Sequence, residues 1–198
     1  MPPAPELPLI AEQRAERADA ARNRVAILEA ARRLMREQGP ELITMDRLAC
    51  EAGVGKGTLF RRFGDRANLF HALLDESERQ LQDGFIRGPA PLGPGAPAAE
   101  RIVAFGHALL THTEQRGALM LAAEPQTPGM RYRSPVYAAY RSHLSNLLWE
   151  LCPGHEDYLA EVLLAGLAPE LVLHQLGGGM SVAALKDAWE DWVRRLIR

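Results

Sequence analysis

Residues 52–70 have the sequence AGVGKGTLFRRFGDRANLF, and this stretch decides the fold. The three-residue turn Gly53-Val54-Gly55 separates a short helix from a second short helix, predicted over residues 56–63. Leu59 and Phe63 lie four residues apart, so both face inward on the second helix. Two short helices joined by a glycine turn and preceded by a longer helix form a helix-turn-helix unit.

The neighbouring residues supply the start and stop signals that this unit needs. Thr44 is placed to cap the first short helix, and Asp65 is placed to cap the longer helix that follows. Gly64 can take the left-handed conformation that ends the second short helix. The preceding helix is predicted over residues 22–38 and ends at Gly39-Pro40. Its apolar face is predicted to comprise Val25, Leu28, Ala31, Leu34 and Met35.

The whole chain is predicted to be all-α, because helical spacing recurs and no alternating strand pattern is present. Residues 88–99, GPAPLGPGAPAA, contain four prolines and three glycines and mark a domain boundary. We expect a flexible arm over residues 1–20, a three-helix helix-turn-helix domain with a connecting helix over 21–87, and a helical bundle over 88–198. The helices of the bundle are predicted near 102–110, 119–123, 135–151, 156–176 with a kink at Pro169, and 182–197.

The exposed face of the second short helix has the chemistry of a DNA contact. With Leu59 and Phe63 inward, Gly57, Thr58, Arg61 and Arg62 face solvent. This face combines hydrogen-bond donors with little bulk, which suits a helix that enters a major groove. An ordinary solvated helix face is the alternative. The net charge of −2 does not argue against DNA, because surface charges act locally at physiological salt.

The segment from Ile43 to Leu73, above all residues 52–70, resembles the DNA-binding domain of the TetR family of bacterial regulators. The usual family pattern is AGVSKGTLYxHFxSKExL, and this chain has a glycine at residue 55 where the family has serine or threonine. Phe60 stands in place of a tyrosine that commonly binds phosphate, Arg62 in place of histidine or tyrosine, and Arg66 in place of a lysine. The positions that match the pattern are Ala52, Gly53, Val54, Lys56, Gly57, Thr58, Leu59, Phe63 and Leu69.

The resemblance implies a dimeric, one-component transcription repressor that binds palindromic operator DNA and is released by a small effector. Arg61 and Thr58 are the candidates for base contacts, and Arg62 is a candidate for a phosphate contact. Thr44 is primarily a helix cap, with a phosphate contact as a second role. The full set of expected DNA-binding residues is Thr44, Lys56, Gly57, Thr58, Phe60, Arg61, Arg62 and Arg66.

The resemblance also implies that the C-terminal domain binds the effector and forms a homodimer. The last two helices carry Leu163, Leu167, Trp189 and Trp192, which we expect in a four-helix dimer interface, with packing inside one subunit as the alternative. A DNA-binding dimer without an effector is the competing function. The expected effector-binding residues are His107, Thr111, Met120, Glu124, Tyr137, Tyr140, Arg141 and His174.

Several other classes of protein are disfavoured by the sequence. The six histidines include no i, i+4 pair, and the two cysteines lie about a hundred residues apart, so no metal site is expected. Nucleophile elbows, phosphate loops and dinucleotide-binding glycine patterns are missing, which predicts neither an enzyme nor a cofactor. The N-terminus lacks a secretion signal, so we expect a cytoplasmic protein with no membrane partner.

Overall fold

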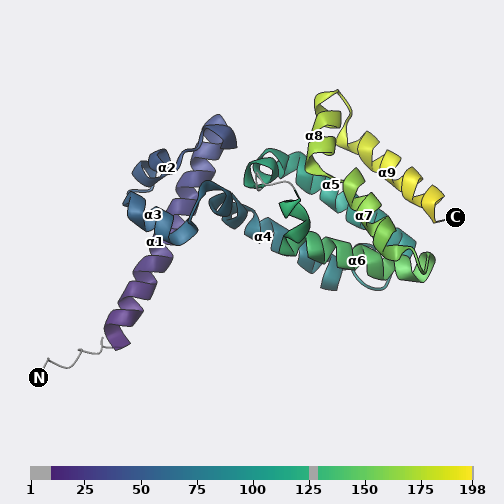
Figure 1. Ribbon diagram of the computed structural model, residues 1–198, viewed down its shortest axis with the longest axis horizontal. Coiled ribbons are helices and arrows are strands. Elements are labelled where there is room, and N and C mark those ends of the chain that lie inside the picture. Colours follow the sequence, from purple (N-terminus) through teal and green to yellow (C-terminus); the bar gives the residue numbers. More distant parts are fainter. Residues whose placement is uncertain (1–9, 125–128, 198) are drawn as a thin grey trace, which may run out of the picture. The chain divides into compact units, whose positions relative to one another are not determined.

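The structure is a computed structural model that describes residues 10–124 and 129–197, with side chains from Asp19 onward. The described residues contain helices and no strand, which confirms the all-α prediction (Figure 1). The helices are α1 (Ile10–Gln38), η1 (Pro40–Leu42), α2 (Met45–Glu51), α3 (Lys56–Phe63), α4 (Arg66–Arg87), α5 (Ala98–Ala123), η2 (Met130–Arg133), α6 (Pro135–Leu151), α7 (Glu156–Gly166), α8 (Pro169–Gly177) and α9 (Val182–Leu196).

The chain divides into two compact units, Met1–Leu73 and Leu74–Arg198. Helix α4 belongs to both units, because it begins at Arg66 and runs without interruption to Arg87. The boundary therefore lies within a helix, whereas the sequence placed it at residue 88. The proline-rich segment 88–97 lies inside the second unit, where Leu92 packs against the core.

The first unit is built around a small apolar core contributed by α1, α2, α3 and the start of α4. The buried side chains of α1 are Ile27, Ala30, Ala31 and Leu34, which follow the i, i+3, i+4, i+7 spacing of one helix face. The buried face of α1 is rotated about the helix axis relative to the predicted face, because Val25 is exposed and Ile27 is buried. The partners in this core are Ile43, Leu48, Ala49, Leu59, Phe63, Leu69, Phe70 and Leu73.

Helix α1 is longer than the sequence indicated. It begins at Ile10, so residues 10–20 are helical and the expected flexible arm is wrong for that part. Residues 1–9 of the expected arm lie outside the described residues. No strong cap or apolar stripe marks the start of α1, and the sequence pattern became regular only where α1 meets the core.

The second unit is a helical bundle in which α5 contacts α6, α8 and α9. The close approach of α5 and α9 depends on Gly106, because a Cβ at that residue would lie 2.0 Å from indole atoms of Trp189. The Trp189 Nε1–H also donates a hydrogen bond to the Val103 carbonyl, at 3.2 Å. A glycine on α5 and an indole on α9 thus set the spacing of these two helices.

Two helix predictions in this unit need correction. The separate helix expected near residues 119–123 is the last part of α5, which continues unbroken from Ala98. The kinked helix expected over 156–176 is instead two helices, α7 and α8, because Pro169 starts a new helix with Ala168 as its N-cap residue. Helix α6 has the predicted bounds, and the Ser134 hydroxyl caps its start by accepting from the Tyr137 N–H.

Candidate nucleic-acid interface

The turn between α2 and α3 is fixed by backbone conformation and backbone hydrogen bonds. Gly53 has φ +65°, a conformation that favours glycine, and the Val54 N–H donates to the Ala49 carbonyl at 3.0 Å. Leu59 is fully buried and Phe63 nearly so, which holds the inner face of α3 against the core. Helix α3 spans the predicted residues 56–63, so its outer face is the one expected from the sequence.

Helix ends around this turn are capped as the sequence predicted, with one weak point. The Thr44 hydroxyl accepts from the Arg47 N–H at 3.2 Å, and the Asp65 carboxylate accepts from the Asn68 N–H at 2.8 Å. Gly64 has φ +76° and ends α3. Gly55 is the N-cap residue of α3 but provides no side-chain hydrogen bond. The recognition helix therefore starts with a weaker cap than serine would give.

The outer face of α3 is open at its first turn. A Cβ added at Gly57 would meet no atom within 4 Å, and the residue is exposed. Arg61 is exposed, Thr58 and Arg62 are half-buried, and Phe60 presents 47% of its surface to solvent. An exposed phenylalanine beside two guanidinium groups suits contact with thymine methyl groups or sugars as well as phosphates.

The four cationic side chains near α3 have different surroundings. Among the residues that the structure describes, no carboxylate forms an ion pair with Arg61 or Arg62. Lys56 forms an exposed ion pair with Asp46, at 2.7 Å between Nζ and Oδ2. The Arg66 guanidinium donates to the Pro40 carbonyl at 2.7 Å and lies over the Phe70 ring. Arg66 thus links α4 to η1, and its expected contact with DNA stays a prediction.

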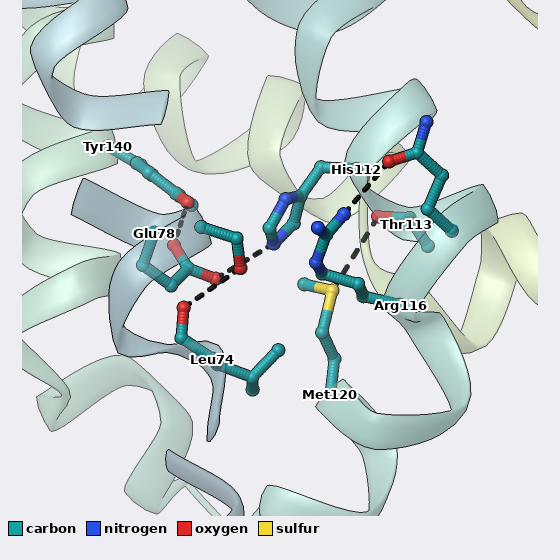
Figure 2. Close-up of polar contacts among 9 residues, drawn as sticks. Leu74, Glu78, His112, Thr113, Arg116, Met120 and Tyr140 are labelled. Atoms are coloured by element: carbon teal, nitrogen blue, oxygen red, sulfur yellow. Dashed lines mark hydrogen bonds and ion pairs between the residues drawn. The ribbon is translucent and has the colours of Figure 1, made fainter. Parts of the chain in front are cut away.

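The eight expected effector-binding residues have several different sets of contacts, and Met120 and Tyr140 are seen together in the close-up of Figure 2. On α5, His107 contacts the Lys186 carbonyl of α9, and the Thr111 hydroxyl donates to the carbonyl of His107 one turn earlier. Met120 accepts a weak contact from Thr113 at 4.0 Å. His174 is exposed on α8.

Tyr137 and Arg141 both contact α7. The Tyr137 hydroxyl donates to Glu161, and Arg141 pairs with Asp157 at 3.1 Å and with Glu161 at 3.7 Å. Burial, followed by the hydrogen bond to Glu161, raises the pKa of Tyr137, so its hydroxyl remains protonated. This cluster joins α6 to α7 and explains why a partly exposed arginine lies beside a tyrosine.

Glu124 lies in a further group, at the end of α5. The Arg131 guanidinium lies 3.6 Å from Glu124 and 3.0 Å from Glu170, and so bridges the two carboxyl groups. Burial, followed by a hydrogen bond with Glu170, raises the pKa of Glu124. The two carboxyl groups can therefore share a proton. The described residues contain no group of three or more side chains arranged to hold a metal ion.

Tyr140 belongs to a buried polar cluster that the sequence analysis missed. Its hydroxyl donates to Glu78 of α4, and His112 Nε2 of α5 lies 3.2 Å from the other Glu78 oxygen (Figure 2). Glu78 and His112 are only 8% and 7% exposed, and charged residues are rarely so buried without partners. Burial and the nearby Glu78 charge raise the pKa of Tyr140, which keeps the donor protonated. A polar residue on the otherwise apolar face of α4 was the available signal.

Comparisons with known proteins agree with this geometry. A family described as "Bacterial regulatory proteins, tetR family" matches residues 27–73. An HTH-type transcriptional regulator of Staphylococcus aureus (strain USA300) is 45% identical over 58 residues, which cover 29% of this chain and 31% of that protein. The chain thus spans less than a third of the curated relative that it matches.

Solved structures extend the similarity to the whole fold. A TetR-family transcriptional regulator from Streptomyces coelicolor has a TM-score of 0.62 at 21% identity, covering 90% of this chain and 95% of that one. A TetR-like transcriptional regulator from Rhodococcus sp. RHA1 has a TM-score of 0.61 at 19% identity, covering 87% and 94%. The helix-turn-helix segment, residues 27–73, therefore matches the tetR family of bacterial regulatory proteins, and the chain as a whole shares its all-α fold with these two solved structures.

Proposed function

We propose that this protein is a cytoplasmic transcription repressor that binds a palindromic operator as a homodimer and is released by a small effector. The observation that carries the DNA-binding role is the outer face of α3, where Gly57 leaves open space and Arg61 and Arg62 extend from the next turn. Arg61 and Thr58 would contact base edges, and Arg62 and Lys56 would contact phosphates. Named relatives that share this segment are transcriptional regulators.

The test is selection of bound genomic fragments, followed by titration of the enriched duplex with single variants. Arg61→Ala should weaken binding to the selected duplex by about tenfold and bring it closer to binding of random DNA, since one bidentate base contact contributes ~1–3 kcal/mol. Arg62→Ala should weaken both equally and lower the slope of log K against log salt by about one. Arg195→Ala, an exposed arginine on α9, is the matched control. Failure to enrich any sequence would refute the proposal.

Dimerisation is supported by apolar surface that the single chain leaves uncovered. The stretch Glu156–Gly177 is apolar enough by composition to cross a membrane, yet only 33% of its most apolar 18 residues are buried in the subunit. Leu163 and Leu167 are buried in that subunit, as is Trp189, so the interface expected from the sequence is wrong at these three residues. Tyr158 on α7 and Leu171 on α8 remain exposed and are the better candidates.

Sedimentation at micromolar concentration tests the dimer. The wild-type chain should sediment as a dimer, and Leu171→Glu should dissociate it because a charge would be buried in an apolar contact. Trp149→Glu is the matched control, since Trp149 is also an exposed apolar side chain but lies on α6. A monomeric wild-type protein, or equal dissociation of both variants, would refute this part of the proposal.

Effector release is supported by the position of Glu78 on α4. Helix α4 carries Glu78 in the second unit and Arg66 in the first, and Glu78 is held there by Tyr140 of α6 and His112 of α5. A ligand that takes the place of either partner would change the contacts that hold α4. By linkage, such a ligand must bind the DNA-free state better by the factor that operator affinity loses.

A metabolite panel screened by melting temperature, with operator affinity measured for each hit, tests the release mechanism. Glu78→Gln keeps the shape of the side chain, so this variant should still bind the operator but should respond less to the ligand. If stabilising ligands leave operator affinity unchanged, the protein is the alternative, a ligand-independent dimeric DNA binder. This alternative is favoured because the expected effector residues contact several different protein partners.

A further inference from the structure

The first unit has a cleft that the helix-turn-helix alone does not explain. It lies between α1 and α3, has a volume of about 730 Å³, and is open to solvent. From Asp19 onward, where the side chains of α1 are described, the first buried one is Ile27, so the lining residues lie N-terminal to those that pack in the core. The lining residues are Asp19, Ala20, Asn23 and Arg24 of α1 and Thr58, Arg61 and Arg62 of α3.

The side chains in this cleft form a set of donors with a net positive charge. Three arginines and one aspartate line it, which gives a net charge of +2 (three minus one). Asp19 is itself paired with Arg22, so its charge is partly neutralised. The Arg24 guanidinium lies 5.3 Å from the centre of the Phe63 ring, which fixes the position of this charge. Asn23 and Thr58 add neutral donors to the two walls.

Arginine, amide and hydroxyl groups together are typical of phosphate contacts, because guanidinium donors match the spacing of phosphate oxygens. One wall of the cleft is α3 itself, the helix that would lie in the major groove. The sugar-phosphate strand that borders that groove must therefore pass beside α3, and in helix-turn-helix proteins the first helix of the motif, here α2, crosses this backbone. We propose that the cleft holds one backbone strand of the operator, with Asn23 and Arg24 as a second, α1-borne phosphate-binding wall.

This inference rests on the proposed DNA-binding function and adds to it a contact outside the helix-turn-helix. It also gives the N-terminal part of α1 a role. The contacts from Asn23 and Arg24 on the α1 wall are independent of base sequence, because this wall faces phosphates, whereas Thr58 and Arg61 on the α3 wall remain the candidates for base contacts. The strand bound by Asn23 and Arg24 would add affinity and salt dependence rather than specificity.

Charge changes on α1 test the inference, with the selected operator duplex as the probe. Asn23→Asp adds a negative charge at nearly constant shape, and should raise Kd about five- to tenfold. Arg24→Gln should raise Kd similarly and lower the salt slope by about one, because one phosphate contact is lost. Asp19→Asn removes a negative charge, and should lower Kd about two- to threefold. The control is Arg32→Gln, because Arg32 is an exposed arginine of the same helix outside the cleft.

Chemical neutralisation of the DNA locates the contact. Methylphosphonate substitution of single flanking phosphates should weaken wild-type binding at one or two positions, and should leave Arg24→Gln unaffected at those positions. Equal loss in both proteins would overturn the assignment, as would cleft variants that behave like Arg32→Gln. Melting curves of each variant show whether the fold is retained. The gain in affinity expected for Asp19→Asn cannot result from unfolding, because unfolding would weaken binding.

Two further outcomes are distinguishable. If Arg61→Ala weakens operator binding while the Asp19, Asn23 and Arg24 variants of the α1 wall behave as the control, the proposed function stands and this inference fails. If Arg61→Ala also has no effect, the DNA-binding face of α3 is itself wrong. Inorganic phosphate is the remaining probe. Phosphate would have to compete with operator DNA more strongly than chloride does at equal ionic strength, and Arg24→Gln would have to lose this competition while it still binds DNA. That result would make the cleft a small-anion site and overturn the inference.

Discussion

Replacing Gly57 by alanine should separate the stability of the protein from its DNA binding. Gly57 is the second residue of α3, its backbone does not have positive φ, and its added methyl group would meet no atom within 4 Å. Alanine is favoured over glycine in helices by up to ~1 kcal/mol, and somewhat less near a helix end. We therefore expect Gly57→Ala to stabilise the first unit by about 0.5–1 kcal/mol.

Operator binding should change in the opposite direction. The new methyl group points into the space that a base pair must occupy if α3 lies deep in the major groove. Holding α3 away from the bases by even one carbon atom would break the two-point hydrogen bonds of Arg61. A loss of about tenfold in Kd corresponds to ~1.4 kcal/mol, comparable to one base contact.

The assay combines urea unfolding with fluorescence anisotropy on the selected duplex. Gly177→Ala is the matched control, because Gly177 is a helical glycine of the second unit whose Cβ would also meet nothing within 4 Å. The control should leave Kd unchanged. Unchanged Kd for Gly57→Ala, with the expected gain in stability, would show that α3 does not approach DNA at its first turn and would refute the docking geometry.

Three further changes test packing and titration in the second unit. Gly106→Ala should lower the free energy of unfolding by about 1–3 kcal/mol or more in urea, because its Cβ would overlap Trp189; a neutral effect would contradict the α5–α9 spacing. Burial, with Arg101 nearby, lowers the pKa of His143 to about 4 from 6.5, so stability should fall as pH drops from 6.5 towards 4, and His143→Phe should flatten that profile. The pKa of Glu124 is raised, so ionisation of this carboxyl disfavours the folded state. Glu124→Gln should therefore have a higher melting temperature than wild type at pH 7, and the difference should disappear below about pH 4.5. Equal melting temperatures at every pH would argue against the shared proton.

The sequence predicted the helix-turn-helix well because each part of it has a local signal. Glycine at a positive φ, a hydroxyl or carboxylate at a helix start, and Leu59 and Phe63 at i, i+4 spacing all act within a few residues. Helix α3 therefore has the predicted bounds, and the caps at Thr44 and Asp65 are confirmed. The α1 face was less well predicted, because both Val25 and Ile27 suit a buried position by type and only the packing partner decides between them.

The second unit was harder because its polar contacts join helices distant in the sequence. Glu78 meets His112 and Tyr140 across 34 and 62 residues, and no local pattern indicates such a pairing. Tyr140 was predicted as one of the effector-binding residues, but its partner Glu78 could not be identified from the sequence. The break between α7 and α8 also went unrecognised, because a proline can either kink a helix or start a new one.

The continuity of α4 has a consequence for engineering. Arg66 and Glu78 are 12 residues apart on one unbroken helix, which corresponds to about 18 Å along its axis. In a chimera joined between Leu73 and Leu74, the junction therefore also sets how the second part of α4 is rotated about the helix axis. Inserting one residue there would turn Glu78 by ~100° around the axis, whereas removing seven would restore nearly the same orientation. Second units from other proteins of this architecture should therefore be joined to this first unit at a position that keeps the helical repeat of α4.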